Sequence, residues 1–332
     1  MKSRNVLPGL GAAGAMLVLI LDSRTALEGM RSAVELYLQT LIPSLFPFFV
    51  LCVYLTGNLA GCDFRLLRPL CRVLAIPDGA QMLLITGFLG GYPTGAQSVA
   101  QAYENGQLSR TKANRLLAFC SNAGPACLFG GVGQAFDSPS APWMLWLIHI
   151  ISAVLVGIIS QEHSGQVFLP RNTVPISLTQ SLRKTIAVMA QVCGWVAVFR
   201  MILCYLDRWF GWLLPDSLGV IIAGILELSN GCIRLREVES EGIRFVAASA
   251  LTALGGLCVF LQTRSVTGTL SLRYYFAGKL LQSAFSILLA SIWVRQPLTP
   301  WLWSVIGLIG VISILILRKT EKNSSIPAAF GV

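Results

Sequence analysis

A single acid at the end of a short apolar segment is the most chemically suggestive residue in the sequence. Glu227 directly follows the apolar run 220–226. A helix of about 10 residues rises roughly 15 Å, half of the ~30 Å hydrocarbon core of a bilayer, so this carboxyl group is expected near mid-depth. A carboxylate there is costly and marks a functional candidate that could bind a polar solute, carry a proton or ligate a cation. The alternative is a neutral Glu hydrogen-bonded to broken backbone.

Other polar side chains lie where apolar segments are interrupted by helix-breaking residues, at 90–95, 121–125, 229–231 and 252–256. A broken helix exposes unpaired N–H groups on one side and carbonyl oxygens on the other, so four breaks that meet would form a polar pocket for a solute and a cation. The alternative is that Gly and Pro only allow close helix packing. The candidate substrate-binding residues are Tyr92, Thr94, Gln97, Ser121, Asn122, Glu227, Ser229, Asn230 and Thr252.

No catalytic or metal-binding pattern accompanies these residues. The sequence has no GxSxG, HExxH or Walker motif, and its nine cysteines form no CxxC pair. We therefore predict no enzyme, no metal site and no cofactor, with the cysteines as buried thiols. His149 lies in an apolar run and is expected to be a packed or hydrogen-bonded histidine. Arg200 lies within an apolar segment, where it would pair with an acid or reach the outer interface.

The composition places these residues in a membrane. Of the 332 residues, 55% are hydrophobic and only 12% are charged, whereas a soluble domain has about 25% charged residues. The mean hydropathy is +0.69. These values exclude a soluble globular protein, a disordered chain and a free nucleic-acid binder, although the net charge is +10. The partner is therefore the lipid bilayer, and the basic excess is expected in cytoplasmic loops.

The apolar segments predict an all-α polytopic membrane protein with about eight transmembrane helices plus two re-entrant hairpins. The predicted spans are 6–21, 41–60, 113–135, 143–160, 186–206, 245–263, 279–295 and 299–317. Two further apolar segments, near 80–90 and 218–228, are too short to cross. Each meets a helix-breaking patch at mid-depth, which predicts a turn and an exit on the same side. Irregular backbone at that depth survives only when it is buried in protein or lines a wet cavity.

The distribution of basic residues agrees with this topology. With both termini in the cytoplasm of a cell-membrane protein, 17 Lys and Arg residues fall inside and 7 outside, which follows the positive-inside rule. Lys279 is counted with the cytoplasmic loop that precedes the span 279–295. Treating either hairpin as a full span inverts every later segment and spoils this asymmetry. The first hairpin then enters from the cytoplasm and the second from outside.

Because the two hairpins enter the membrane from opposite sides, we predict an inverted-topology repeat within a single membrane domain, 1–332. Ile76-Pro77-Asp78-Gly79 precedes the first hairpin and Leu214-Pro215-Asp216-Ser217 precedes the second. The helices that follow share an Ile-x-Gly pattern, at 85–89 and at 222–226. The first repeat is predicted over 41–160 with hairpin 79–105, and the second over 177–296 with hairpin 217–240. Paired broken segments of this kind point to a transporter site.

Three stretches resemble the sporulation integral membrane protein family, which contains the nucleoside-recognition (Gate) domain. They are Gly91-Tyr92-Pro93-Thr94-Gly95-Ala96, the run 115–125 ending in Ser121-Asn122-Ala123-Gly124-Pro125, and the run 224–231. The resemblance covers about residues 40 to 295 and implies a role in endospore formation, in particular spore cortex assembly. The domain is more distantly similar to concentrative nucleoside transporters, which have two hairpins and two broken helices. Both hairpins of those transporters carry a substrate-facing Glu; Glu227 matches the second, and the tip of the first hairpin here, Tyr92-Pro93-Thr94-Gly95, has no acid.

These observations favour a permease for a small polar solute, with a coupling cation or proton, in the cell (inner) membrane. Glu227, Asn122 and the hairpin backbones would hold the solute or the ion. The alternative is a non-transporting membrane scaffold or assembly protein needed in sporulation. Whether copies of the chain form a homo-oligomer stays open.

Overall fold

The computed structural model describes residues 6–59, 61–77, 79–160, 175–213, 215–295, 306–313 and 315–316. Every regular element in these ranges is a helix. Both chain ends, Asp78, Leu214 and much of the predicted span 299–317 lie outside the described residues. The sidedness of the termini and the helix-start signal at Pro77-Asp78 therefore stay predictions, whereas a helix does begin at Asp216, directly after Pro215.

Five described helical segments are long and apolar enough to cross a membrane. They are Ser23–Leu59, Ala141–Ile159, Leu178–Leu213, Glu241–Val266 and Arg273–Trp293. A sixth apolar helix, α1 (Val6–Leu21), is shorter, with 16 residues. The predicted span 113–135 is not a continuous helix. The chain is thus an all-helical, multi-pass integral membrane protein, which confirms the prediction at this coarser level.

The first long segment consists of α2 (Ser23–Leu36), a π-helical turn (Tyr37–Leu41) and α3 (Ile42–Leu59). The wide turn lies just before Pro43, whose ring cannot donate an N–H bond and crowds the preceding turn. The Ser44 hydroxyl donates to the Thr40 carbonyl at 2.6 Å and so satisfies one backbone acceptor in this turn. The wide turn thus joins α2 and α3 without ending the helical path.

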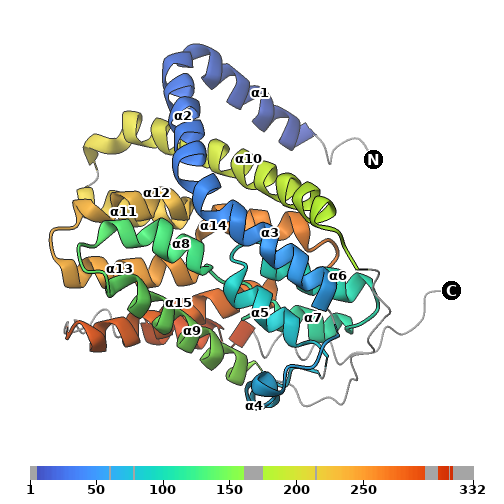
Figure 1. The fold of residues 1–332 in the computed structure, drawn as a ribbon. Coiled ribbons are helices and arrows are strands. Elements are labelled where there is room, and N and C mark those ends of the chain that lie inside the picture. Colours follow the sequence, from blue (N-terminus) through green and yellow to red (C-terminus); the bar gives the residue numbers. More distant parts are fainter. Residues whose placement is uncertain are drawn as a thin grey trace.

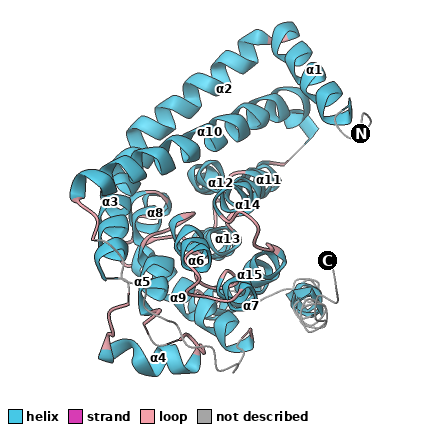
Figure 2. Cartoon of the chain, turned by 90° about the vertical axis from the view of Figure 1, so that its right-hand side faces the viewer, coloured by secondary structure: helices cyan, strands magenta, loops and turns pink. Residues whose placement is uncertain are grey.

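The longest helix, α10 (Leu178–Phe210), packs along α2 and α3. Its first turn is held by a capping box, in which Ser177 and Gln180 exchange side-chain and backbone hydrogen bonds. Figures 1 and 2 show α2 and α10 side by side above the remaining helices, with α1 at the far end of α2. These long helices form one wall of the protein.

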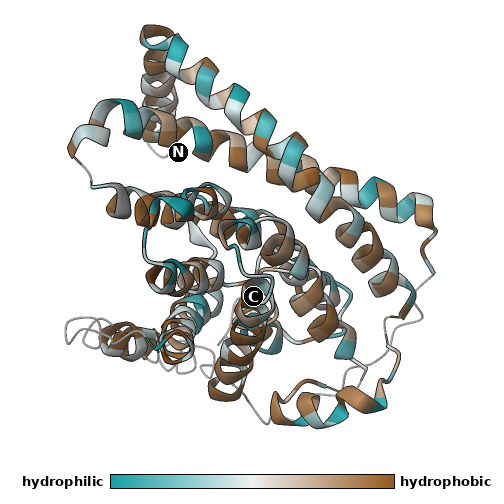
Figure 3. Ribbon diagram, turned by 60° about the vertical axis from the view of Figure 1, so that its left-hand side comes forward, coloured by the Kyte–Doolittle hydropathy of each residue, from teal (hydrophilic) through white to brown (hydrophobic). Residues whose placement is uncertain are grey.

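Large apolar side chains cover much of the outer surface. Leu7 is 79% exposed and Ile20 is 71% exposed. In water this exposure would favour aggregation, but lipid tails solvate such side chains. Apolar residues dominate most of the helical ribbons in Figure 3. The outer surface therefore suits a bilayer, and the polar contacts are found inside the helix assembly.

Two pairs of short helices pack beside the long ones. The first pair is α5 (Gln81–Leu89) with α6 (Thr94–Glu104), and the second is α11 (Asp216–Leu226) with α12 (Leu228–Arg234). The break in the first pair, at 90–93, agrees with the predicted position. The second break was predicted at 229–231, but those residues are helical and the interruption is Glu227. The Glu227 side chain caps the next helix, so the helix restarts immediately.

Each pair is followed by an interrupted segment. The first consists of α7 (Arg110–Leu116), non-helical residues 117–124, α8 (Pro125–Gly130) and the 3-10 turn Val132–Ala135. The second consists of α13 (Glu241–Leu254) and α14 (Gly256–Val266), separated at Gly255. Gly255 and Gly256 both have left-handed φ angles, of 77° and 78°, which only glycine adopts without strain. Both breaks lie where the sequence predicts them.

The remaining helices enclose these broken segments. They are η3 (Arg65–Leu67), α4 (Arg68–Val73), α9 (Ala141–Ile159), η5 (Gly211–Leu213), η6 (Leu235–Glu237) and α15 (Arg273–Trp293). Helix α15 packs on α13, α9 and α7, so it contacts broken segments of both halves of the chain. This central position gives α15 access to the interior polar groups described next.

Candidate functional site

Glu227 begins α12 with its own side chain. Its Oε1 accepts a hydrogen bond from the Ser229 N–H at 3.1 Å, and its Oε2 accepts from the Asn230 N–H at 2.7 Å. These N–H groups belong to the first turn of a helix, where no intrahelical acceptor exists and negative charge is favoured. Glu227 is 2% exposed. Both carboxyl oxygens are therefore bonded to the helix start that follows the break.

Asn230 links this carboxyl group to two long helices. Its Nδ2 donates to Glu227 Oε2 at 2.6 Å, and its Oδ1 accepts from Arg200 Nη1 at 2.6 Å. Arg200 lies on α10, and its Nε donates to Ser32 Oγ of α2 at 2.9 Å. Arg200 thus pairs with an amide and a hydroxyl, not with the acid that the sequence suggested. The helix packing brings Asn230 between the guanidinium and the carboxyl group.

At the break between α7 and α8, Asn122 is the polar side chain around which the other hydrogen-bonding groups gather; these groups are called the Asn122 centre below. Its Nδ2 donates to the Gly87 carbonyl at 3.1 Å and to the Phe119 carbonyl at 2.7 Å. The next backbone N–H, of Ala123, donates to His149 Nε2 at 3.1 Å. His149 is therefore a buried, hydrogen-bonded histidine, as predicted. Side chains thus satisfy backbone groups that the interrupted helix leaves without partners.

Lys279 lies at this centre, and its sequence-based placement in a cytoplasmic loop was wrong. It is 1% exposed, six residues into α15. Its Nζ donates to Gln282 Oε1 at 2.6 Å and to Asn122 Oδ1 at 3.1 Å. The ammonium also lies 5.2 Å from the centre of the Tyr92 ring. Because α15 begins at Arg273, the predicted span 279–295 starts too late, which put Lys279 at the very start of the span, where it was counted with the preceding loop.

Tyr92 joins the two halves of the chain. Its hydroxyl lies 3.3 Å from the Thr252 carbonyl and 3.4 Å from the Ala253 carbonyl, at the end of α13. The Thr252 hydroxyl itself donates to the Ala248 carbonyl of its own helix at 2.8 Å. The break of the first short pair therefore touches the break between α13 and α14. Tyr92 and Thr252, both predicted site residues, are therefore in contact, but the contact uses the backbone carbonyl of Thr252 and not its side chain.

A small cavity of about 100 Å³ lies between the breaks. Tyr92, Glu227 and Ser229 line it, together with Ala123 and Gly124 of the α7–α8 break. Apolar residues of α10, Cys127 and several further polar side chains, among them Ser44 and Gln262, also line it. Tyr92, Glu227 and Ser229, three of the predicted site residues, thus line the same cavity as residues of the α7–α8 break. A volume of this size accommodates a few water molecules or a small ion.

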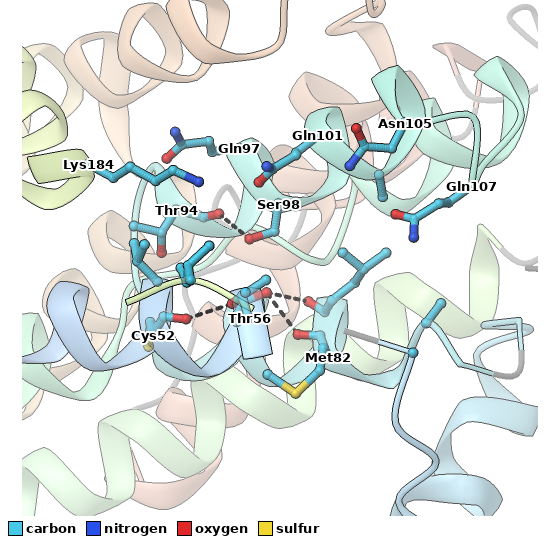
Figure 4. A pocket seen from close by; sticks show the side chains of 18 of the residues that line it. Cys52, Thr56, Met82, Thr94, Gln97, Ser98, Gln101, Asn105, Gln107 and Lys184 are labelled. Carbon is cyan, nitrogen blue, oxygen red and sulfur yellow. Dashed lines mark hydrogen bonds between the residues drawn. The ribbon is translucent and has the colours of Figure 1, made fainter. Parts of the chain in front are cut away.

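A larger cavity of about 460 Å³ lies between α3, the first short pair and the start of α10. Among the described residues, its polar lining consists of neutral side chains and one cation: Thr56, Thr86, Thr94, Gln97, Ser98, Gln101, Asn105, Gln107 and Lys184. In Figure 4, Gln97 and Gln101 extend from α6 on one side, Thr56 of α3 lies opposite, and Lys184 points in from α10. The volume falls in the range of small-molecule sites.

The predicted site residues are therefore divided between two cavities and the protein interior. Thr94 and Gln97 line the larger cavity, whereas Tyr92, Glu227 and Ser229 line the smaller one. The others, Ser121, Asn122, Asn230 and Thr252, are fully buried. The Ser121 hydroxyl has no hydrogen-bond partner. No single cavity collects the whole set.

The chain is similar to a sporulation protein. It shares 20% identity over 325 residues with the sporulation integral membrane protein YlbJ of Bacillus subtilis strain 168, covering 84% of this chain and 80% of that protein. No protein-family model matches the chain, and no solved structure matches it. The similarity agrees with the resemblance that the Gly-Tyr-Pro and Asn-Ala-Gly-Pro motifs indicate.

Sequence reasoning missed three groups that the fold brings to these sites. They are Lys279 and Gln282 at the Asn122 centre, and Lys184 at the larger cavity. A signal for the first pair exists, because the apolar stretch begins near Tyr274 and includes Lys279. The position of Lys184 had no such signal, since it depends on how α10 packs along α3. Among the described residues, no three His, Cys, Asp or Glu side chains cluster as metal ligands would.

Proposed function

We propose that the chain is a permease-like membrane protein that moves a small polar solute and acts in sporulation. The observation that carries this proposal is the close contact between each broken segment and its pair of short helices. A Cβ on Gly124 would lie 2.9 Å from the Gly91 nitrogen, and one on Gly256 would lie 2.7 Å from the Gly224 carbonyl oxygen. Such breaks, held together in a protein interior, are the arrangement in which transporters bind solutes and ions.

The glycine contacts also support an inverted repeat with two re-entrant hairpins and eight spans, including 113–135 and 299–317. Gly87 and Gly224 occupy the same place in the two sequence echoes. Each meets a glycine of the second short helix: Gly87 approaches Gly95, and Gly224 approaches Gly231. This correspondence is the expected result of one ancestral hairpin used twice. Under the proposal both termini are cytoplasmic.

The larger cavity is the proposed solute site. Four amide side chains can both donate and accept hydrogen bonds, which suits a solute with several hydroxyl or amide groups. Lys184 is the one charged group among the described residues of its lining and would favour a solute with a negative or electron-rich group. Glu227 belongs to the smaller cavity and would carry a coupling proton or act on the movement of α12.

Ligand-induced thermal stabilisation tests this proposal directly. The full chain, purified in detergent, would be screened with nucleosides first, because of the Gate-domain resemblance, then with amino acids, sugars and sugar acids. A ligand of the larger cavity raises the Tm of the wild type but not that of Gln97→Ala. The matched control is Gln39→Ala, since Gln39 is exposed and, within the described part of the chain, its side chain bonds only to Glu35. A ligand shift that persists unchanged in Gln97→Ala would place the solute elsewhere.

The sporulation role rests on the name of the similar protein. It is tested by asking whether this chain restores spore formation to a Bacillus subtilis strain that lacks YlbJ. Restoration supports a shared role, and a stable but inactive chain in that strain contradicts it.

A non-transporting scaffold is the second candidate, and one observation favours it. Both oxygens of Glu227 are bonded to the chain's own helix start, so this carboxylate stabilises the fold without any ligand. If Glu227→Gln and Gln97→Ala both restore sporulation fully and no solute shifts the Tm, the scaffold is the better interpretation.

A further inference from the structure

The interior of the first break contains the side-chain amine of a lysine, Lys279, and none of the described carboxylates pairs with it. Lys279 Nζ has two hydrogen-bond acceptors, Gln282 Oε1 and Asn122 Oδ1, and both are neutral amide oxygens. The rings of Tyr92 and Tyr275 lie 5.2 and 5.9 Å from Nζ. A buried lysine in a membrane-spanning helix is costly, so its position calls for a function.

The two amide oxygens are oriented toward the ammonium by other bonds. Asn122 Nδ2 is held by the Gly87 and Phe119 carbonyls, so Oδ1 must point the opposite way. Gln282 Nε2 donates to Asn122 Oδ1 at 3.1 Å and to the His149 carbonyl at 3.2 Å, which directs Oε1 to Nζ. Amide oxygens held in place in this way, beside an interrupted helix, are ligands suited to a monovalent cation.

The ammonium does not extend toward water, as lysines at membrane interfaces do. Lys279 is 1% exposed, and Asn122 and Gln282 are fully buried. Long basic side chains near helix ends normally reach the interface. Lys279 instead points from α15 to the α7–α8 break, between the two halves of the chain. Its position is determined by the acceptors and not by solvent.

We infer that the Lys279 ammonium is a tethered cation, which occupies the place of a free monovalent cation at the first helix break. The side chain is part of the chain, so the centre is permanently filled and needs no ion from solution. Under the proposed function, on which this consequence rests, solute movement requires no sodium ion. Removing the ammonium should leave two oriented oxygens in a buried site, and a small cation should then bind from solution.

Thermal unfolding of the full chain in detergent tests this inference without any solute. The Tm is measured in NaCl, KCl, methylammonium chloride and choline chloride at equal ionic strength, for the wild type and for Lys279→Met. The wild-type Tm should be the same in all four salts. The Tm of Lys279→Met should be lower in choline, which is too large for the site, and should rise saturably with at least one of the small cations.

Two further variants keep the result interpretable. In Lys279→Arg the guanidinium supplies a cation, so its Tm should not depend on the salt even if Lys279→Met cannot be purified. In Lys279→Met/Asn122→Ala one oxygen is missing, so the rise with small cations should be reduced or lost. A Na⁺-dependent rise in the wild-type Tm overturns the inference. The inference is also overturned if the Tm of Lys279→Met does not change with any cation, or if Lys279→Met is more stable than the wild type in choline.

This experiment separates the inference from the proposed function. A positive cation response in Lys279→Met with no solute shift in any screen leaves the tethered cation in place and removes the permease. If a solute raises the Tm and the wild-type Tm also depends on Na⁺, the permease proposal stands and the tethered cation is ruled out.

Discussion

The Tyr92 hydroxyl lies 3.3 Å from the carbonyl oxygen of Thr252, a residue 160 positions later in the chain. This contact joins the break of α5 and α6 to the last turn of α13. The carbonyls of Thr252 and Ala253 lie next to the left-handed Gly255, where the helix cannot continue its own hydrogen-bond pattern. One phenol therefore connects two breaks, one from each half of the chain.

Tyr92→Phe should lower the free energy of unfolding by about 1 kcal/mol, because the ring stays while a buried hydrogen bond is lost. The measurement is thermal or denaturant unfolding in detergent. Tyr54→Phe is the matched control, since Tyr54 lies on α3, is partly exposed and donates no hydrogen bond. Equal stability of Tyr92→Phe and Tyr54→Phe would show that the contact contributes nothing.

Glu227→Gln should destabilise the protein by roughly 1–3 kcal/mol. The carboxylate accepts three hydrogen bonds, from Ser229 N–H, Asn230 N–H and Asn230 Nδ2. Gln has one acceptor oxygen, and its NH₂ group would face donors. The Tm of this variant is compared with that of Glu239→Gln, which changes an exposed acid and should leave the Tm within experimental error. A Glu227→Gln protein as stable as the wild type would mean that the native carboxyl group is already neutral.

Gly231→Ala should destabilise the protein by about 1–3 kcal/mol or prevent folding, because the added methyl group would overlap with the Gly224 backbone. Gly219→Ala, on α11, is the control: the nearest atom to its added Cβ is an Arg234 nitrogen at 4.0 Å. The control should be neutral or stabilising, by up to ~1 kcal/mol, because Ala favours helix over Gly. Comparable yields and Tm values for the two variants would contradict the close packing of α11 and α12.

The loop after α3 predicts a pH effect. Asp63 accepts hydrogen bonds from Arg68 and Gln81, which lower the pKa of Asp63 from 3.8 to about 2. Because the folded pKa lies below the unfolded value, the carboxylate stabilises the fold above about pH 3.8, and this contribution is lost as the pH falls toward 2. The Tm difference between wild type and Asp63→Asn should therefore be present at pH 5 and above, using ~5 as the upper end of the transition. A difference that stays constant down to pH 2 would exclude this role.

Cysteine labelling tests the proposed topology. In a cysteine-free chain, Glu104→Cys at the end of α6 should react only after the membrane is made permeable, and Glu239→Cys should react with an impermeant maleimide in intact cells. If the cysteine-free chain does not fold, the exposed native Cys62 provides the cytoplasmic reference. Labelling of both engineered positions from the same side would exclude the inverted repeat.

Local sequence determined the helical elements and most of their interruptions. Gly255 and Gly256 adopt φ angles that other residues avoid, and the polar and helix-breaking residues at 121–125 interrupt an apolar segment, so these breaks were readable without a structure. The placement of Glu227 at the end of a short apolar helix was also readable, because a lone acid after a short apolar run stands out. Its exact role was not, since the helix restarts one residue later through a side-chain cap.

Only the tertiary structure decided which polar groups meet. Lys279 was assigned to a loop because loop charge was counted by segment, whereas α15 starts at Arg273 and turns this side chain toward Asn122. Likewise, Thr94 and Glu227 belong to different cavities, because α6 packs with α5 and α7, whereas α12 packs with α11 and α13. Apolar composition and helix-breaking residues act locally along the chain, so their effects can be predicted from the sequence. The partner of a buried charge depends on the register and rotation of helices that are far apart in the chain, and those are set by packing.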